Sequence, residues 1–368
     1  MKSNYFEYGK EYILNKISGV CESDAIRVLS RGVFSSVDDF IVLISEPAEK
    51  FLPEIARLAD KTKTRRFGKI IKLYAPIYVS NKCRNSCVYC GFNSANSISR
   101  KTLSLEEIEN EAKKIKESGF DNILIVSGSF PKEVDINYLE KAVGIIKKYF
   151  SYIAVEIYPM EEEEYGRLIA AGVDGLALYQ ETYDRDVYSQ MHPSGRKRNY
   201  DYRIEALERG GKAGFRDLGF GVLLGLYDWR IDSVFMVMHS KYIMKKYWKS
   251  RINFSFPRIR PAASGFNPPY TVTDRNLAQL ICAVRLCFPD AGLNLSTREN
   301  SELRNRLIRT GVTQMSAGSK TNPGGYSENA DSEEQFRVSD DRTPDEIFDF
   351  IKQSGFDPVW KDWDNNLK

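Results

Sequence analysis

The sequence has only two histidines, no long apolar run and almost no excess of charge of either sign. A membrane-spanning helix needs about 20 consecutive apolar residues, so no membrane association is expected. The 53 basic and 50 acidic side chains give a net charge of +3, which gives no reason to expect nucleic acid as a partner. The N-terminus has neither the apolar core nor the cleavage site of a secretory signal, so a cytoplasmic location is expected.

Cysteine is also scarce, and its distribution does not indicate a disulfide framework. Three of the six cysteines, Cys83, Cys87 and Cys90, lie within Lys82–Phe92 with the spacing C-x3-C-x2-C. Thiolates this close can bind one metal centre, and iron–sulfur clusters are commonly held by grouped cysteines. Three ligands leave one iron of a cubane cluster open, which favours catalysis. A zinc site is the alternative, but residues 22–191 contain no further cysteine or histidine to complete it.

Segments with the character of strands and of helices alternate from residue 70 onward. The expected strands are Ile70–Val79, Asn122–Ser127, Tyr152–Ile157, Gly175–Tyr179, Leu218–Leu226, Ile252–Phe256, Leu293–Ser296 and Val312–Ser316. A helix separates each strand from the next, and this order requires parallel pairing with right-handed crossovers. The sequence therefore predicts an α/β fold, a closed (β/α)8 barrel of the TIM type. An open barrel of six strands is the alternative.

Residues 1–69 are expected to form an N-terminal helical extension. Helices predicted over Glu7–Ile17, Ser23–Ser30 and Ser36–Ile44 have apolar faces that need a surface to pack on. The basic stretches Lys61–Arg66 and Arg196–Arg198 are interpreted as solvated faces or linkers. The barrel is expected over residues 70–320, and residues 321–368 are expected to form a short helical tail that packs on it.

Polar side chains and glycine follow the expected strands at their carboxyl ends, where barrel enzymes place their active sites. The cysteine loop follows the first strand. Later strands end at Ser127–Ser129, Glu156, Gln180–Glu181, Arg258, Arg298 and Ser316. Strand order alone therefore predicts that these residues surround one site.

The cysteine motif, with the aromatic Tyr89 before its last cysteine, resembles the radical S-adenosylmethionine (SAM) superfamily. Seven further strings, in order, resemble the aromatic-amino-acid lyases and, among them, the ThiH-type 2-iminoacetate synthases (tyrosine lyases). They are Tyr179–Tyr183 (Y-Q-E-T-Y), Gly221–Leu226, Asp228–Arg230, Ser255–Pro261, Leu295–Glu299, Ser316–Tyr326 and Pro358–Asp364. The resemblance runs from about Ile71 to the C-terminus.

This resemblance implies a cofactor pair and a reaction. A 4Fe-4S cluster would bind SAM at its open iron and, on reduction, yield a 5′-deoxyadenosyl radical. The radical would take a hydrogen atom from the amino group of L-tyrosine, and the Cα–Cβ bond would break to give 2-iminoacetate (dehydroglycine) and p-cresol. A thiazole synthase of the ThiG type would receive the 2-iminoacetate for thiamine biosynthesis, and a flavodoxin- or ferredoxin-type protein would supply the electron.

Other functions fit the sequence less well. The tyrosine lyase that serves the diiron hydrogenase cofactor carries further cysteines near its C-terminus, whereas no cysteine follows Cys287 here. The tryptophan lyase of antibiotic pathways shares Asp184 but lacks the terminal K-D-W-D pattern. Sulfur-inserting radical enzymes need extra cluster cysteines or a nucleic-acid-binding domain. An iron–sulfur scaffold would not need an arginine for a substrate carboxylate.

The resemblance also implies roles for individual residues. Glu181 and Arg203 would bind SAM, and Glu156 would bind its ribose or its ammonium group, with ordinary ion pairs as the alternative. Tyr89 and Phe92 would pack on the cluster and the adenine. Arg298 and Ser316 would hold the substrate carboxylate, since arginine offers it a bidentate fork. His239 would accept or relay the phenolic proton, although a helical histidine often has only a structural role.

One position departs from the family pattern. The family usually has Gly-Glu after the second strand, where the glutamate binds the SAM ammonium, but this chain has Gly128-Ser129. A neutral hydroxyl cannot supply the charge-assisted hydrogen bond. Either Glu156 or a backbone carbonyl compensates, or SAM binds more weakly.

Overall fold

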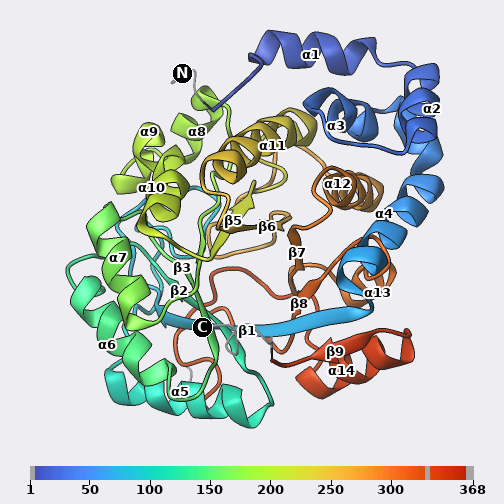
Figure 1. Ribbon diagram of the computed structural model, residues 1–368. Helices are drawn as coiled ribbons and strands as arrows, with labels where there is room; N and C mark the ends of the chain where they lie inside the picture. The colour runs from blue at the N-terminus through green and yellow to red at the C-terminus, as the bar shows by residue number, and fades with distance from the viewer. Residues whose placement is uncertain (1–4, 328–331, 362–368) are drawn as a thin grey trace.

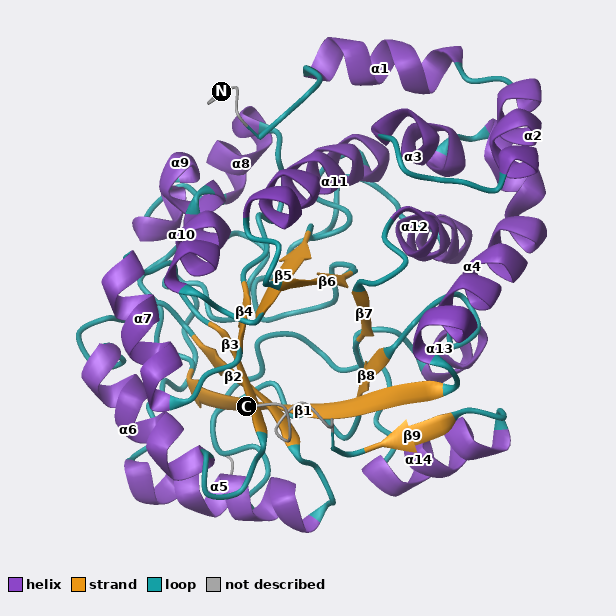
Figure 2. Cartoon of the chain, viewed as in Figure 1, coloured by secondary structure: helices purple, strands orange, loops and turns teal. Residues whose placement is uncertain are grey.

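A closed ring of eight parallel strands forms the centre of the molecule. The computed structural model describes residues 5–327 and 332–361. The strands are β1 (Ile70–Ser80), β2 (Asn122–Ser127), β3 (Tyr152–Glu156), β4 (Gly175–Ala177), β5 (Asp217–Gly221), β6 (Arg251–Ser255), β7 (Gly292–Leu295) and β8 (Gln314–Ser316). Each strand pairs with the next, and β1 pairs with both β2 and β8, which closes the barrel (Figures 1 and 2). The predicted (β/α)8 fold is confirmed, and the six-stranded alternative is wrong.

Helices connect the strands on the outside of the ring (Figure 1). They are α5 (Leu105–Glu117), α6 (Ile136–Ile146), α7 (Glu162–Ala171), α8 (Arg185–Met191), α9 (Tyr200–Ile204), α10 (Ala206–Ala213), α11 (Trp229–Lys246), α12 (Asp274–Cys287) and α13 (Ser301–Leu307). A capping box begins α5, because Ser104 Oγ accepts the Glu107 N–H and the Glu107 carboxylate accepts the Ser104 N–H. Within the described part of the chain, none of the helices has the length and apolar character needed to cross a membrane.

Some predicted elements differ from those observed. The strand expected over Leu218–Leu226 ends at Gly221, and the rest continues as an irregular segment that bridges Val222 to Glu181 and Leu224 to Arg258. Gly225, at φ +113°, takes a conformation that other residues rarely adopt, so the strand cannot extend through it. More than one helix separates β4 from β5, where α8, α9 and α10 follow one another.

The N-terminal helices wrap around one side of the barrel, outside α11 and α12 (Figure 1). They are α1 (Lys10–Gly19), α2 (Glu22–Arg31), α3 (Val37–Ile44) and α4 (Leu52–Phe67), with the short helix η1 (Pro47–Phe51) between the last two. Sequence reasoning missed α4. Most of its residues are at least partly exposed and many are charged. Its buried residues are Ile55, Ala59 and Lys63, which lie four residues apart on one face. The Lys63 ammonium donates to the Gly68 carbonyl at 2.9 Å.

The described part of the C-terminal segment adds α14 (Pro344–Gln353) and β9 (Asp357–Val359), and β9 extends the sheet from β1. Parallel pairing joins β9 to Ile70–Lys72. The Asn122 side-chain amide donates to the carbonyls of both Leu73 and Trp360, which ties this strand to the barrel. The end of the predicted string Pro358–Asp364 lies outside the described residues. The expected domain boundaries at residues 69 and 320 stay a prediction.

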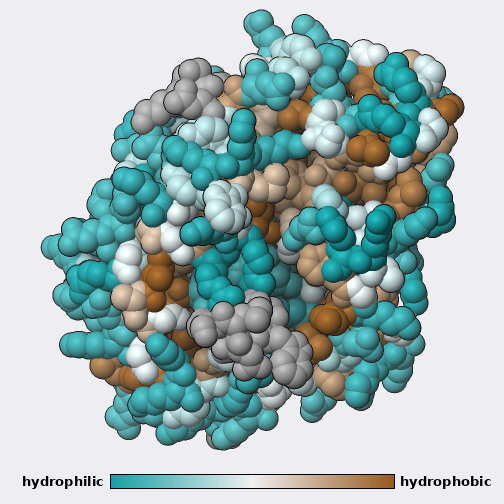
Figure 3. Space-filling model, in the orientation of Figure 1, coloured by the Kyte–Doolittle hydropathy of each residue, from teal (hydrophilic) through white to brown (hydrophobic). Residues whose placement is uncertain are grey.

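Hydrophilic side chains cover much of the face seen in Figure 3. Hydrophobic side chains gather there chiefly between the N-terminal helices and the barrel, over α3 and α12. This is where the apolar faces of the N-terminal helices pack: Phe40, Ile41 and Ile44 of α3 are at most 1% exposed. The extension is therefore bound to the barrel by an apolar interface.

Candidate active site

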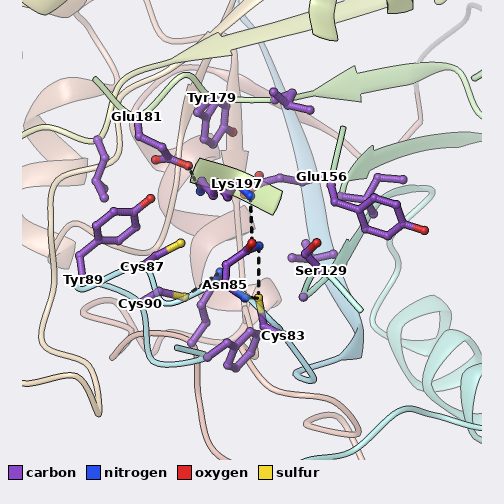
Figure 4. A pocket seen from close by; sticks show the side chains of 18 of the residues that line it. Cys83, Asn85, Cys87, Tyr89, Cys90, Ser129, Glu156, Tyr179, Glu181 and Lys197 are labelled. Atoms are coloured by element: carbon purple, nitrogen blue, oxygen red, sulfur yellow. Dashed lines mark hydrogen bonds and ion pairs between the residues drawn. The ribbon is translucent and has the colours of Figure 1, made fainter. Parts of the chain in front are cut away.

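A deep cavity opens at the carboxyl ends of the strands, where the polar strand-end residues were predicted to meet. It encloses about 1250 Å³ of space not filled by protein atoms, part of it open to solvent. The sequence-predicted residues that line it are Cys83, Cys87, Cys90, Tyr89, Phe92, Ser129, Glu156, Glu181, Arg203 and Arg298. In Figure 4 the cysteines, Glu181, Glu156 and Ser129 surround one space. A second cavity shares Glu156, Tyr179 and Arg298 with the first and reaches Ser316.

The cysteine loop is held in place by close backbone contacts. Gly128 lies against the loop so tightly that a Cβ there would be 2.3 Å from the Lys82 carbonyl oxygen and 3.3 Å from the Cys83 Cβ. The Arg84 N–H donates to the Ser129 carbonyl at 3.0 Å. Asn85 directs its backbone and side-chain N–H groups at Cys83 Sγ, at 3.5 and 3.6 Å. These contacts fix the loop before any cofactor is bound.

The segment M-H-P-S-G, residues 191–195, supports the other side of the loop. The Val88 N–H donates to the Met191 carbonyl at 3.1 Å, and the Ser86 and Ser194 hydroxyls are 2.7 Å apart. Gly195 has φ +88°, and a Cβ there would lie 2.4 Å from Asn85 Oδ1. This string, whose function the sequence did not reveal, packs directly against the cysteine loop.

His192 is buried and orients Tyr89. Its Nδ1 lies 2.8 Å from the Tyr188 carbonyl, which can only accept, so Nδ1 carries the proton. Nε2 then carries no proton and accepts a hydrogen bond from the Tyr89 hydroxyl at 2.8 Å. Burial lowers the pKa of His192 to about 3, so the ring is neutral. His192 therefore fixes the aromatic ring that stands between the second and third cysteines.

The thiols and their surroundings fit an iron–sulfur cluster. Burial raises the pKa of Cys87 and raises that of Cys90 to about 12, so a bound cation is needed to hold either as thiolate. Amide N–H groups face the sulfurs of Cys83 and Cys90, as is usual around cluster ligands. No group of three His, Cys, Asp or Glu side chains in the described ranges is close enough to bind one metal ion. In a cubane cluster each cysteine binds a different iron atom, so the three sulfurs lie further apart than the ligands of a single metal ion.

Glu181 is an ionised carboxylate in an unusual backbone conformation. Its φ of 73° is the one positive value of a residue other than glycine in the described chain. Such strain is uncommon and concentrates at functional sites. Burial alone would raise the pKa of Glu181, but Lys197 at 2.6 Å and Arg203 at 3.2 Å lower it. Arg203 also donates to the Tyr179 carbonyl at 2.9 Å, which fixes its guanidinium at the cavity wall.

Glu156 and Ser129 lie on the opposite wall from Glu181 (Figure 4). Burial raises the pKa of Glu156, and the charge of Arg298 opposes this rise. Ser129 is 8% exposed and uses its backbone carbonyl to hold Arg84. Glu156 is thus a carboxylate on the same wall as Ser129, and the compensation predicted from the sequence would fall to it.

Exchanging Ser129 for glutamate tests this compensation. We expect Ser129→Glu to keep the SAM binding that the resemblance implies, or to make it tighter, because it adds a charge-assisted acceptor. Isothermal titration with SAM under anaerobic conditions measures the affinity, with Ser129→Ala as the matched control. Loss of SAM binding in the glutamate variant would show that this wall of the pocket has been rebuilt.

Arg298 lines both cavities, and no ion pair with a described residue neutralises its charge. Its guanidinium stacks on the Phe336 ring, with Cζ 3.4 Å from the ring centroid. No carboxylate of the described residues lies within ion-pair distance of it, whereas Arg258 and Arg260 are both bound to Glu299. Ser316, in the second cavity, accepts the Thr297 N–H on its Oγ at 3.0 Å. A planar cation without a partner at a cavity wall is suited to a carboxylate ligand.

His239 does not reach the site. It lies on α11 between β5 and the N-terminal segment, against the rings of Tyr5, Phe220 and Tyr183, and lines neither cavity. Its Nδ1 is 3.0 Å from the Tyr183 hydroxyl, and burial lowers its pKa to about 3. The predicted role in accepting the substrate's phenolic proton has no support in this geometry, because the helix turns this side chain into the layer between helix and strand.

The cavity also contains residues that sequence reasoning missed. Lys197 pairs with Glu181 and lies over the Tyr89 ring, yet its basic stretch was interpreted as solvated. Gln335 and Phe336 line both cavities although about 245 residues separate Gln335 from Cys90. No local pattern in the sequence signals either of the last two.

Comparisons with known proteins point to one family. Two family descriptions match the chain: the Radical SAM superfamily over residues 77–238 and the Biotin and Thiamin Synthesis associated domain over residues 255–357. The chain is 39% identical to a 2-iminoacetate synthase of Escherichia coli, over 96% of this chain and 93% of that protein. The corresponding protein of Salmonella typhimurium is 38% identical over the same shares.

A solved structure with a similar fold is that of HydG, a maturase of the [FeFe]-hydrogenase. Its TM-score is 0.93 at 32% identity, and the alignment covers 99% of this chain and 82% of that one. Methylornithine synthase (PylB), at 20% identity and a TM-score of 0.72, shares the fold.

Proposed function

The chain belongs to the 2-iminoacetate synthase family of the radical SAM superfamily, and from this membership we propose that it is a tyrosine lyase. It cleaves the Cα–Cβ bond of L-tyrosine to 2-iminoacetate and p-cresol. The observation that carries the proposal is the cavity itself. Two cavities with shared lining residues bring together the cysteine loop, the carboxylates that we assign to SAM, and Arg298, which pairs with no described carboxylate.

The residues of the first cavity bind the cofactors. Cys83, Cys87 and Cys90 would hold the 4Fe-4S cluster, and Glu181 and Arg203 would hold SAM, with Glu156 facing Glu181 across the cavity. When bound, this pair supplies the 5′-deoxyadenosyl radical that takes a hydrogen atom from the substrate. Glu181 is ionised and can accept hydrogen bonds from ribose hydroxyls or from the SAM ammonium group.

The residues at the junction of the two cavities position the substrate. Arg298 binds the tyrosine carboxylate through two parallel N–H donors, and the Ser316 hydroxyl lies in the same cavity. Stacking on Phe336 keeps the guanidinium in one plane. An anchored carboxylate leaves the amino group as the part of the substrate that faces the first cavity, so its N–H is presented to the radical.

Removing the charge of Glu181 is expected to weaken SAM binding. Glu181→Gln loses charge-assisted hydrogen bonds and leaves Lys197 and Arg203 without their carboxylate. A hydrogen bond to a charged group contributes about 1.5–3 kcal/mol, so the dissociation constant for SAM should rise about tenfold or more. Equilibrium binding of SAM measures this, with the exposed Glu302→Gln as the control. An unchanged dissociation constant would remove Glu181 from the SAM site.

The product determines the partners that we propose. 2-Iminoacetate is an imine that reacts with water to give glyoxylate and ammonium, so it must pass quickly to the next enzyme. A thiazole synthase of the ThiG type takes this role, and a flavodoxin- or ferredoxin-type protein supplies the electron. Such a hand-off places the chain in the cytoplasm.

Complementation tests the proposed pathway. A bacterium that lacks its own 2-iminoacetate synthase is expected to grow without added thiazole when it produces this chain. The Cys87→Ala variant at the same protein level is the control and should not support growth. If the natural chain fails while its tyrosine cleavage in vitro succeeds, the lyase serves another pathway.

A further inference from the structure

A segment from near the chain end, residues 332–336, lies against the cysteine loop. The Gln335 N–H donates to the Thr321 carbonyl at 2.9 Å, and the Gln335 carbonyl accepts the Gly91 N–H at 3.0 Å. A Cβ on Gly91 would lie 2.5 Å from that carbonyl oxygen, so only glycine allows this approach. The backbone of Gln335 is therefore fixed one residue away from the loop's last cysteine.

The side chain of Gln335 has one orientation. Its Oε1 accepts the Tyr78 hydroxyl at 2.8 Å, and burial raises the pKa of Tyr78 well above 10, so that hydroxyl keeps its proton. With Oε1 engaged, Nε2 points at Cys90 Sγ, 3.9 Å away. The reversed amide would place its oxygen against the electron-rich sulfur of Cys90, which offers it no hydrogen bond. The sulfur therefore selects the orientation in which Gln335 donates to the cysteine, and the hydrogen bond from Tyr78 holds the amide in it.

We propose that Gln335 tunes the iron–sulfur cluster, a role that rests on the proposed function. An N–H donor to a ligand sulfur stabilises the more negative, reduced state of a cluster and so raises its reduction potential. Gln335 directs its N–H at Cys90, as Asn85 directs two at Cys83 on the other side of the loop. The C-terminal segment therefore makes the cluster easier to reduce.

A redox titration of the reconstituted protein tests this role without any substrate. Electron paramagnetic resonance follows the reduced cluster of the natural protein, of Gln335→Leu and of the control Gln353→Leu, an exposed glutamine of α14. The midpoint potential of Gln335→Leu should be more negative than that of the other two at equal iron content. Tyr78→Phe, which releases the amide from its fixed orientation, should shift the potential in the same direction by less.

Equal midpoint potentials for the natural protein and a fully loaded Gln335→Leu would overturn the proposal. If the leucine variant does not load iron fully, Gln335→Asn decides, because its shorter amide is withdrawn from Cys90. A midpoint below that of the natural protein supports tuning, and an equal midpoint refutes it. Tyrosine cleavage is not part of the measurement, so a failed lyase assay and a failed tuning assay are separate results.

Discussion

Arg298→Lys is expected to lower kcat/KM for L-tyrosine by about 100-fold or more, mostly through KM. Lysine keeps the charge, but it is a point donor that cannot form two parallel hydrogen bonds or stack flat on Phe336. Losing one charge-assisted hydrogen bond costs about 1.5–3 kcal/mol and losing the stacking about 0.5–1 kcal/mol more, which together correspond to this range. Steady-state formation of p-cresol over a range of tyrosine concentrations provides the measurement.

Two controls isolate the substrate carboxylate. Arg306→Lys changes an exposed arginine of α13 and should leave kcat/KM unchanged. SAM affinity of the Arg298 variant should also be unchanged, because lysine keeps the positive charge that acts on Glu156, and Glu181 and Arg203 are paired with each other. A KM for tyrosine equal to that of the natural protein would show that Arg298 does not bind the substrate.

Gly128→Ala is expected to lower cluster loading strongly and, with it, SAM cleavage. The added methyl group would lie 2.3 Å from the Lys82 carbonyl oxygen, so the backbone beside Cys83 must move. Overpacking of this kind costs about 1–3 kcal/mol at a rigid site, and the loop can avoid the cost by giving up its position. We expect iron content and 5′-deoxyadenosine formation to fall by about tenfold or more. Iron analysis and chromatography after anaerobic reconstitution measure both.

Gly144→Ala is the matched control, because the helix α6 leaves open space around that position. This variant should fold and load iron like the natural protein. A Gly128→Ala protein with full iron content and normal SAM cleavage would mean that the cysteine loop tolerates displacement, and that its close packing is not what holds the cluster residues in place.

The order of elements predicted most of the barrel and one side of the site. Parallel strands in sequence order bring their carboxyl ends to one rim, so Glu156, Glu181 and Arg298 could be placed together without a structure. The cysteine loop followed from its spacing. The helix α4, by contrast, could not be predicted. Its sequence is rich in charged residues, and one of the three residues in its buried stripe is Lys63.

Two features of the site could not be derived from the sequence, for physical reasons. His239 lies on α11, which is buried nearly all round because the N-terminal helices cover its outer face. Such a helix has no single apolar stripe that marks the side facing the barrel. The direction in which the His239 side chain points therefore could not be predicted from the sequence. Gln335 and Phe336 reach the cavity from a distant segment by backbone pairing with Gly91 and Thr321, and no periodicity records such contacts.

The central claim is that this cavity generates a radical from SAM and uses it to cleave tyrosine. The most direct test is an anaerobic reaction of the reconstituted protein with SAM, a reductant and L-tyrosine, followed by chromatography of the products. The account predicts 5′-deoxyadenosine and p-cresol together, in amounts that rise with tyrosine, and neither product from Cys87→Ala. Formation of 5′-deoxyadenosine without p-cresol would contradict tyrosine as the substrate and make tryptophan the next to test.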